Sequence, residues 1–309
     1  MRPSFFIVGA PKCGTTALYD YLRENPCVFL PDVKEPHFFC ADFPGYGSIR
    51  SLPDYLKLFQ EVPRTCMVAG EASVFYLYSQ VAVKQLLEFE PNARLVVMLR
   101  DPVPMLHSLH SQQLFNFRET EPDFEKAWRM QPERLRGENL PPLCETPLHL
   151  QYAAVGRLGE QLQRVYRHAS REQVHVIFYD DFAAQTGKEY EKVLKFIGAP
   201  PDGRTAFPKV NANKTHRFPR LSQLAMRPPF PLNIIKNGVR SWLGTHGASK
   251  VRELIYWSLT ERPLRTSLRA EFIAEIRQDL ADDVRLLEDL TGRDLRHWRD
   301  PAEAIRRAA

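Results

Sequence analysis

The stretch FIVGAPKCGTTALYDYL, residues 6–22, predicts a buried strand, a tight turn and a helix. The turn contains two glycines, a lysine and two threonines, which are the residue types of a loop that binds phosphate. Gly9 and Gly14 have the spacing of the Walker A motif, but Thr15 stands where that motif has its lysine. The lysine of this turn, Lys12, lies inside the loop, so its ammonium reaches a different side of the phosphate.

A second strand pattern, ARLVVMLR at 93–100, ends in Arg100 followed by Asp101. A nucleoside triphosphatase needs a carboxylate at a strand end to hold magnesium. Here an arginine comes first, at the carboxyl end of a parallel strand, where ligands bind in such sheets. A guanidinium suits a phosphate better than a metal ion. The two features together favour a ligand with phosphate groups at two places and no obligatory metal.

Three motifs together resemble the PAPS-dependent sulfotransferases, above all the heparan sulfate type and its bacterial relatives. In chain order they are PKCGTTAL (11–18), KEPHFF (34–39), and RDP (100–102) with Ser108 eight residues past Arg100. The resemblance covers about residues 4–220, and more loosely the C-terminal helix that ends near Trp298. It implies an enzyme that moves a sulfuryl group from 3′-phosphoadenosine 5′-phosphosulfate (PAPS) to a hydroxyl or amine, releases PAP (adenosine 3′,5′-bisphosphate), and requires no metal.

The resemblance also implies roles for the motif residues. The 5′-phosphosulfate is expected to lie in the loop of Lys12, Cys13, Gly14, Thr15, Thr16 and Ala17, and the 3′-phosphate against Arg100 and Ser108. Lys12 is the candidate to stabilise the leaving phosphate. The alternatives are structural: Lys12 as a solvated loop residue, Arg100 as an ion-pair partner of Asp101 or Glu71, and Ser108 as a serine on the helix surface.

The segment VKEPHFF, residues 33–39, carries the candidate general base. In the heparan sulfate enzymes a glutamate at the position of Glu35 takes the proton of the acceptor, and His37 matches a histidine found in some of them. A positioned base of this kind contributes about 10²–10⁴-fold to the rate. We therefore predict Glu35 as the base, with His37 as the second candidate. The alternative is that Glu35 only pairs with Lys34 at the surface, while Phe38 and Phe39 fill the core.

The chain departs from the family at the end of the strand predicted over 65–71. The family often has a Glu-Lys dipeptide there, whereas this chain has Glu71 followed by Ala72. Glu71 is expected either to support the donor loop or to lie near the acceptor. Lys34 is a candidate to supply the missing positive charge. The disulfide found in lumenal relatives has no counterpart, which agrees with a reducing compartment.

KTHRFP, residues 214–219, resembles the last donor-binding loop of the family. It implies that Lys214 and Arg217 close over the 3′-phosphate or the adenine. The loop lies in a stretch from 203 to 252 that contains ten basic and no acidic residues. This basic segment is expected to form a basic helical cover, to shape a pocket for an anionic or lipidic acceptor, or to contact an acidic membrane surface. Nucleic-acid binding is not expected, because no signature for it accompanies the charge.

The alternation of strand and helix patterns predicts an α/β fold: a parallel sheet flanked by helices on both faces, with a C-terminal helical cover. Strands are predicted over 4–9, 65–71, 93–100 and 173–179, and helices over 15–25, 79–90, 102–115, 150–168, 187–198 and 269–292. We expect a single domain over 1–309. It comprises a core of about 4–200, the basic loop region of about 201–252 and a C-terminal helical region of about 253–309.

The composition agrees with an ordinary globular protein, with 309 residues, 44% of them hydrophobic and 26% charged. A bilayer span needs about 18 apolar residues in succession, and the sequence has no such run. Its start lacks the pattern of a signal peptide. The cysteines are odd in number and form no C-x-x-C pair: Cys13, Cys27, Cys40, Cys66 and Cys144. We therefore expect reduced thiols and a cytoplasmic protein.

Two other functions fit parts of the pattern. A small-molecule kinase on the same scaffold is disfavoured because both the Walker lysine and the magnesium carboxylate are missing. A non-catalytic nucleotide-binding or nucleic-acid-binding module would bind PAP without turning over an acceptor. The sequence does not choose between a carbohydrate, a lipid and a small metabolite as the acceptor, because pockets of this kind are built from loops without a portable code. It carries no prediction of the oligomeric state.

Overall fold

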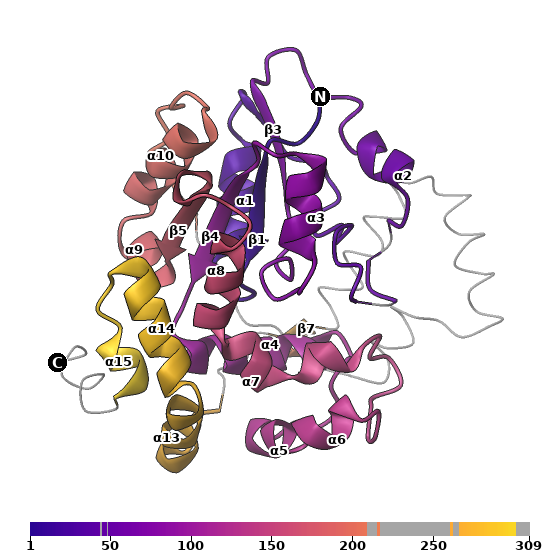
Figure 1. The fold of residues 1–309 in the computed structure, drawn as a ribbon, viewed down its shortest axis with the longest axis vertical. Coiled ribbons are helices and arrows are strands. Elements are labelled where there is room, and N and C mark those ends of the chain that lie inside the picture. The colour runs from indigo at the N-terminus through magenta and orange to yellow at the C-terminus, as the bar shows by residue number, and fades with distance from the viewer. Residues whose placement is uncertain (44, 48, 209–214, 217–259, 262–265, 301–309) are drawn as a thin grey trace.

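A central sheet of five parallel strands organises the chain (Figure 1). The computed structural model describes residues 1–43, 45–47, 49–208, 215–216, 260–261 and 266–300. The strands lie in the order β2 (Val28–Phe29), β3 (Val68–Ala72), β1 (Phe5–Gly9), β4 (Arg94–Leu99) and β5 (Val174–Phe178). All neighbouring pairs are parallel, which places the carboxyl ends of the strands at one edge of the sheet.

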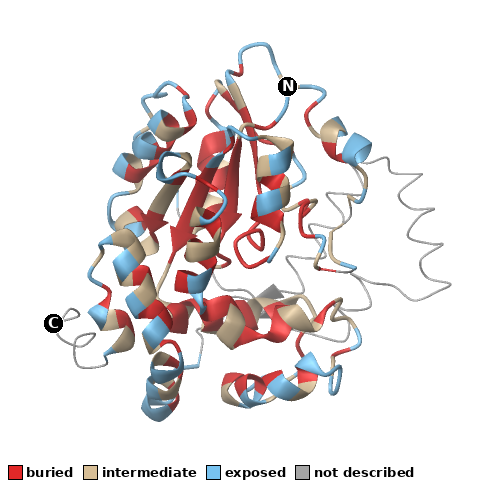
Figure 2. Ribbon diagram, in the orientation of Figure 1, coloured by how far each residue is buried: buried red, intermediate tan, exposed pale blue. Residues whose placement is uncertain are grey.

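Strands β1 and β4 at the centre of the sheet are almost wholly apolar, as is typical of parallel strands that helices cover on both faces. All five residues of β1 are buried, and so are the last five of β4 (Figure 2). The longer flanking helices are α1 (Thr15–Arg23), α3 (Ala82–Phe89), α4 (Pro102–Phe115), α8 (Leu158–Tyr166) and α10 (Thr186–Ile197). The predicted α/β class and parallel sheet are confirmed.

Two helices that the sequence predicts as continuous are each divided. Residues 150–168 form α7 (Tyr152–Gly156) and α8, and residues 269–292 form α13 (Ala270–Asp279) and α14 (Ala281–Thr291). Because α8 starts afresh, its first backbone N–H groups need partners outside the helix. The carboxylate of Asp283 on α14 accepts hydrogen bonds from the N–H groups of Gly159 and Glu160, each at 2.8 Å. This contact is between residues far apart in the sequence, so local periodicity could not predict the break.

The sequence patterns did not predict the short helices and strands, because each contains too few residues to show a periodic pattern. They are β2, α2 (Leu52–Lys57), α5 (Phe124–Arg129), α6 (Gln131–Leu135), η1 (Pro147–Leu150), η2 (Arg171–Gln173), α9 (Tyr179–Ala184) and α15 (Arg296–Arg299). A separate antiparallel pair joins β6 (Thr215–His216) to β7 (Thr260–Glu261), and β6 lies against α4. Within the described ranges, no helix has the length and apolar character required to cross a bilayer.

The C-terminal helical cover is described from residue 266, and α14 packs against α8. Most of the basic segment predicted over 203–252 lies outside the described residues. The same holds for Lys214 and Arg217, the two residues predicted to close over the donor.

Candidate active site

The predicted phosphate loop connects β1 to α1, at the carboxyl edge of the sheet (Figure 1). Lys12 and Gly14 have positive φ angles of 64° and 90°, so the loop curls back on itself. Gly14 directly precedes α1 and has no side chain to cap it. The first backbone N–H groups of α1 therefore point out of the helix end, together with the positive end of its dipole. This geometry is suited to an anion.

Cys13 fills the underside of this loop. Its side chain is buried, and its thiol donates a hydrogen bond to the carbonyl of Pro11 at 3.4 Å. Burial raises the pKa of the Cys13 thiol to about 12, even though the charge of Arg100 acts to lower it. A thiol that stays protonated contributes packing rather than a nucleophile.

Arg100, directly after β4, contacts the phosphate loop. Its Nη1 donates a hydrogen bond to the carbonyl of Lys12 at 3.2 Å, and its guanidinium lies 4.4 Å from the centre of the Tyr179 ring. The carboxylate of the neighbouring Asp101 has other partners. Its carboxylate caps α4 at the N–H of Val103 and lies 3.6 Å from Arg277. The two predicted anion-binding elements, the loop and the end of β4, are thus adjacent.

Ser108 is buried, with 3% of its surface exposed. It lies on α4, about two turns past the helix start at the end of β4. The alternative that Ser108 is an ordinary serine on the helix surface is therefore wrong.

Glu35 lies beside the phosphate loop and shares a lysine with it. The backbone N–H of Glu35 donates to the carbonyl of Ala72 at 2.9 Å, which fixes this segment to the end of β3. Lys34 Nζ donates to Glu35 Oε1 at 2.9 Å and to Thr16 Oγ1 at 2.7 Å. The predicted pairing of Lys34 with Glu35 is present. It is half-buried rather than a surface pair, since the two side chains are 21% and 28% exposed.

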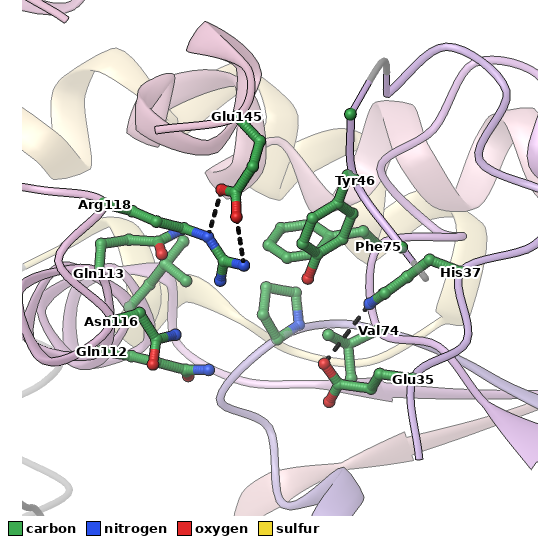
Figure 3. Close-up of a pocket in the computed structure, with 14 residues that line it drawn as sticks. Glu35, His37, Tyr46, Val74, Phe75, Gln112, Gln113, Asn116, Arg118 and Glu145 are labelled. Carbon is green, nitrogen blue, oxygen red and sulfur yellow. Dashed lines mark hydrogen bonds and ion pairs between the residues drawn. The ribbon is translucent and has the colours of Figure 1, made fainter. Parts of the chain in front are cut away.

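His37 lies on the other side of the Glu35 carboxylate. Its Nε2 is 3.5 Å from Glu35 Oε2, and its ring packs on that of Tyr46 at 4.5 Å (Figure 3). Burial acts to raise the pKa of Glu35, but the contact with the His37 imidazole and the charge of Lys34 outweigh it and hold the pKa at about 2. Burial lowers the pKa of His37. The expected state near pH 7 is a carboxylate beside a neutral imidazole.

Glu71 supports this segment from below. It is fully buried, and the hydroxyl of Ser73 donates to its Oε2 at 3.2 Å. The same hydroxyl accepts the backbone N–H of His37 at 3.0 Å. Burial raises the pKa of Glu71 to about 7. These contacts match neither of the two roles expected for Glu71. Its carboxylate is not among the groups that line the cavity beside Glu35, and through Ser73 it supports the segment of Glu35 and His37 rather than the donor loop.

A cavity of about 400 Å³ adjoins Glu35 and His37. Its wall also contains Pro11, so the cavity reaches the N-terminal end of the phosphate loop, next to Lys12. Across from Glu35, Arg118 is fixed by Glu145 through two hydrogen bonds of 2.6 Å and 3.1 Å (Figure 3). Much of the remaining wall is aromatic or amide-bearing, from Tyr46, Phe75, Gln112, Gln113 and Asn116.

The structure brings most of the predicted site residues into one region, and it adds others that the sequence did not indicate. Arg118 and Glu145 form the far wall of the cavity, yet no motif surrounds them. Arg118 follows α4, and Glu145 comes from the loop before η1. Only tertiary structure places them opposite Glu35, and no sequence signal could have identified them.

The fold and the site define a class: α/β proteins with a loop suited to an anion at the carboxyl edge of a parallel sheet, beside a cavity with a carboxylate. The sequence matches the family described as Sulfotransferase domain over residues 2–223. The chain therefore belongs to the sulfotransferase domain family. The resemblance read from its motifs is confirmed.

Individual relatives agree with this membership. Carbohydrate sulfotransferase 15 of Homo sapiens is 35% identical over 147 aligned residues, which cover 34% of this chain and 26% of the relative. Bifunctional heparan sulfate N-deacetylase/N-sulfotransferase 4 of Mus musculus is 24% identical over 202 residues, covering 64% and 22%. The chain thus spans about a quarter of the length of these curated relatives. A solved sulfotransferase from Alicyclobacillus acidocaldarius matches with a TM-score of 0.70 and 27% identity, over 97% of this chain and 100% of that one.

Proposed function

We propose that the protein transfers a sulfuryl group from PAPS to a hydroxyl or amine of an acceptor and releases PAP. One observation carries the proposal: a single cavity has the phosphate-loop residue Pro11 in its wall together with Glu35 and His37. A donor held by the loop and an acceptor held in the cavity would meet at the carboxylate. Membership of the sulfotransferase family supports the reaction type.

The residues near the loop fit the donor. PAPS carries anionic groups at the 5′ and 3′ positions of one adenosine. The loop and the start of α1 would bind the 5′-phosphosulfate, and Arg100 with Ser108 would bind the 3′-phosphate. The contact of Arg100 with the carbonyl of Lys12 supports this division, because it keeps both elements within reach of one nucleotide.

Glu35 would accept the proton of the acceptor hydroxyl or amine as that atom attacks sulfur. The new bond forms between sulfur and the acceptor atom, while the bond between sulfur and the bridging oxygen breaks. The electron pair of the broken bond stays on the 5′-phosphate of PAP. Lys12 would stabilise that developing charge, and Glu35 then returns the proton to water.

The cavity favours a hydroxyl-rich acceptor. Its far wall offers the amides of Gln112 and Asn116 and the Arg118–Glu145 pair, all of which have donors or acceptors for hydroxyl groups. Two aromatic side chains, Tyr46 and Phe75, provide flat apolar surface. Two relatives are named for carbohydrate or heparan sulfate. Among the carbohydrate, lipid and small-metabolite classes, we therefore propose a carbohydrate.

Incubation of the protein with ³⁵S-labelled PAPS and a set of oligosaccharides and monosaccharides tests the proposal. Transfer of label to a saccharide, with one PAP formed for each sulfate transferred, is the expected result. Label on a lipid or phenol from a metabolite extract would correct the acceptor class only. Turnover of ATP with magnesium, without binding of PAP, would replace the proposal by the kinase alternative.

A further inference from the structure

The ammonium of Lys34 connects the donor loop with Glu35. It lies 2.7 Å from Thr16 Oγ1, on the first turn of α1, and 2.9 Å from Glu35 Oε1. An ammonium has three N–H donors, so the carboxylate and the loop hydroxyl share one cation. No motif predicts this sharing, because Thr16 and Lys34 come from different elements.

The charged and titratable groups around this pair are few. From α1, the ring of Tyr19 lies 5.9 Å from Lys34 Nζ, and Asp20 is close enough for Lys34 to act on its pKa. On the other side of Glu35 lie His37 and, from the cavity wall, Tyr46. Among these described neighbours, Lys34 is the cation on Glu35, since burial keeps His37 neutral near pH 7.

A bound donor is expected to change how the Lys34 ammonium is shared between Thr16 and Glu35. The loop and the start of α1 are the part of the site shaped for the anionic end of the nucleotide. A threonine hydroxyl can donate to an anion while its oxygen accepts from an ammonium. An anion placed at Thr16 would attract the Lys34 ammonium more strongly than a neutral hydroxyl does. An ammonium on a flexible four-carbon stem can follow that attraction.

We propose that Lys34 is a positioning residue that couples donor binding to the base. Its ammonium is shared between Thr16 and Glu35 in the donor-free protein and moves toward the donor when the donor binds, which frees the Glu35 carboxylate for the acceptor's proton. The inference rests on the proposed function. It adds an order to the reaction, in which the base becomes effective only after the donor is in place.

Electrostatics predicts that the pKa of Glu35 rises when the Lys34 ammonium moves away. In the donor-free protein, Lys34 and His37 hold the pKa of Glu35 at about 2, which makes the carboxylate a poor proton acceptor. Burial acts in the opposite direction and remains when Lys34 moves. Loss of an opposite charge at this distance typically raises the pKa of a carboxylate by about 1 to 3.

Titration of Glu35 by ¹³C NMR tests the coupling without an acceptor. Protein labelled with [δ-¹³C]glutamate is titrated with and without saturating PAP, and Glu35→Gln identifies the resonance. In the wild type, PAP should raise the pKa of Glu35 by about 1 to 3. In Lys34→Met the pKa should already be raised without PAP, and PAP should add less. Lys34→Arg keeps a cation and should restore the PAP-dependent rise. The matched control Lys57→Met, from an exposed pair with Asp54, should behave as the wild type.

The design separates Lys34 from direct repulsion by the nucleotide. Because PAP is itself an anion, it would raise the pKa of Glu35 even without a mobile lysine. An equal rise in the wild type and in Lys34→Met would overturn the inference, as would PAP binding that leaves the pKa of Glu35 unchanged. Failure of PAP to bind at all, measured by calorimetry on the same samples, would overturn the proposed function and the inference together.

Discussion

Arg100 and Lys12 are joined by a hydrogen bond of 3.2 Å from the Arg100 Nη1 to the Lys12 carbonyl. The two residues are 88 positions apart, at the ends of neighbouring strands β4 and β1. The arginine therefore has two functions in the proposed reaction: it would bind the 3′-phosphate, and it holds the backbone of the loop that would bind the 5′-phosphosulfate.

Arg100→Ala should weaken the binding of PAP by about 10- to 100-fold, the value of a lost hydrogen bond to a charged group. Adenosine 5′-phosphate lacks the 3′-phosphate, so its binding should weaken far less. Calorimetry with both nucleotides measures the loss of affinity for each. The matched control Arg136→Ala removes an exposed arginine paired with Glu138 and should affect neither nucleotide. Equal losses for the two nucleotides would show that Arg100 acts only by holding the loop.

Lys12→Ala should reduce turnover by about 10²–10³-fold, because the developing charge on the leaving phosphate loses its cation. PAP affinity should fall much less, since the backbone of the loop and α1 remain. Transfer of label from PAPS and calorimetry with PAP measure the two effects. Lys84→Ala, an exposed lysine on α3, serves as the control. A loss of affinity as large as the loss of turnover would make Lys12 a binding residue only.

Glu35→Gln should reduce transfer by about 10²–10⁴-fold while PAP still binds, because the amide keeps the shape of the side chain but cannot accept the proton. His37→Asn should be the milder change, since the neutral imidazole acts on Glu35 through a 3.5 Å contact. Transfer of ³⁵S label from PAPS, measured for both variants, shows which substitution lowers activity more. If Glu35→Gln kept its activity and His37→Asn lost it, the histidine would be the base.

Glu71→Gln should change how stability depends on pH. Burial raises the pKa of Glu71 to about 7, from 4.5 for an ordinary glutamate, so the folded protein binds a proton that the unfolded chain releases. The stabilisation is complete below about pH 4.5, declines as pH rises and is lost above about pH 7, a difference of about 3 kcal/mol.

Denaturant unfolding at pH 5 and pH 8 measures this effect. The glutamine variant should lose less stability than the wild type over that interval, because the amide stays neutral at both pH values. Glu88→Gln removes an exposed carboxylate from α3 and should leave the pH dependence as it is in the wild type. The same slope in Glu71→Gln and the wild type would mean that Glu71 is ionised in the folded protein.

The local sequence determined the central strands of this protein, its phosphate loop and the segment that carries the candidate base. The apolar runs within 4–9 and 93–100 predicted two buried strands, because parallel strands covered on both faces carry near-continuous apolar runs. The same two stretches also predicted the phosphate loop between Gly9 and Gly14 and placed Arg100 at the end of the strand over 93–100. The motif around Glu35 and His37 indicated the segment that carries the candidate base.

Tertiary structure decided the rest, because the remaining contacts join residues that no local pattern relates. Asp283 caps the start of α8, within a stretch predicted as one helix, by accepting hydrogen bonds from the backbone of Gly159 and Glu160. Arg118 and Glu145 become the far wall of the cavity only when the loops after α4 and before η1 meet. Lys34 lies between Thr16 and Glu35 only because the backbone of Glu35 is bonded to the end of β3, next to the strand that leads into the phosphate loop.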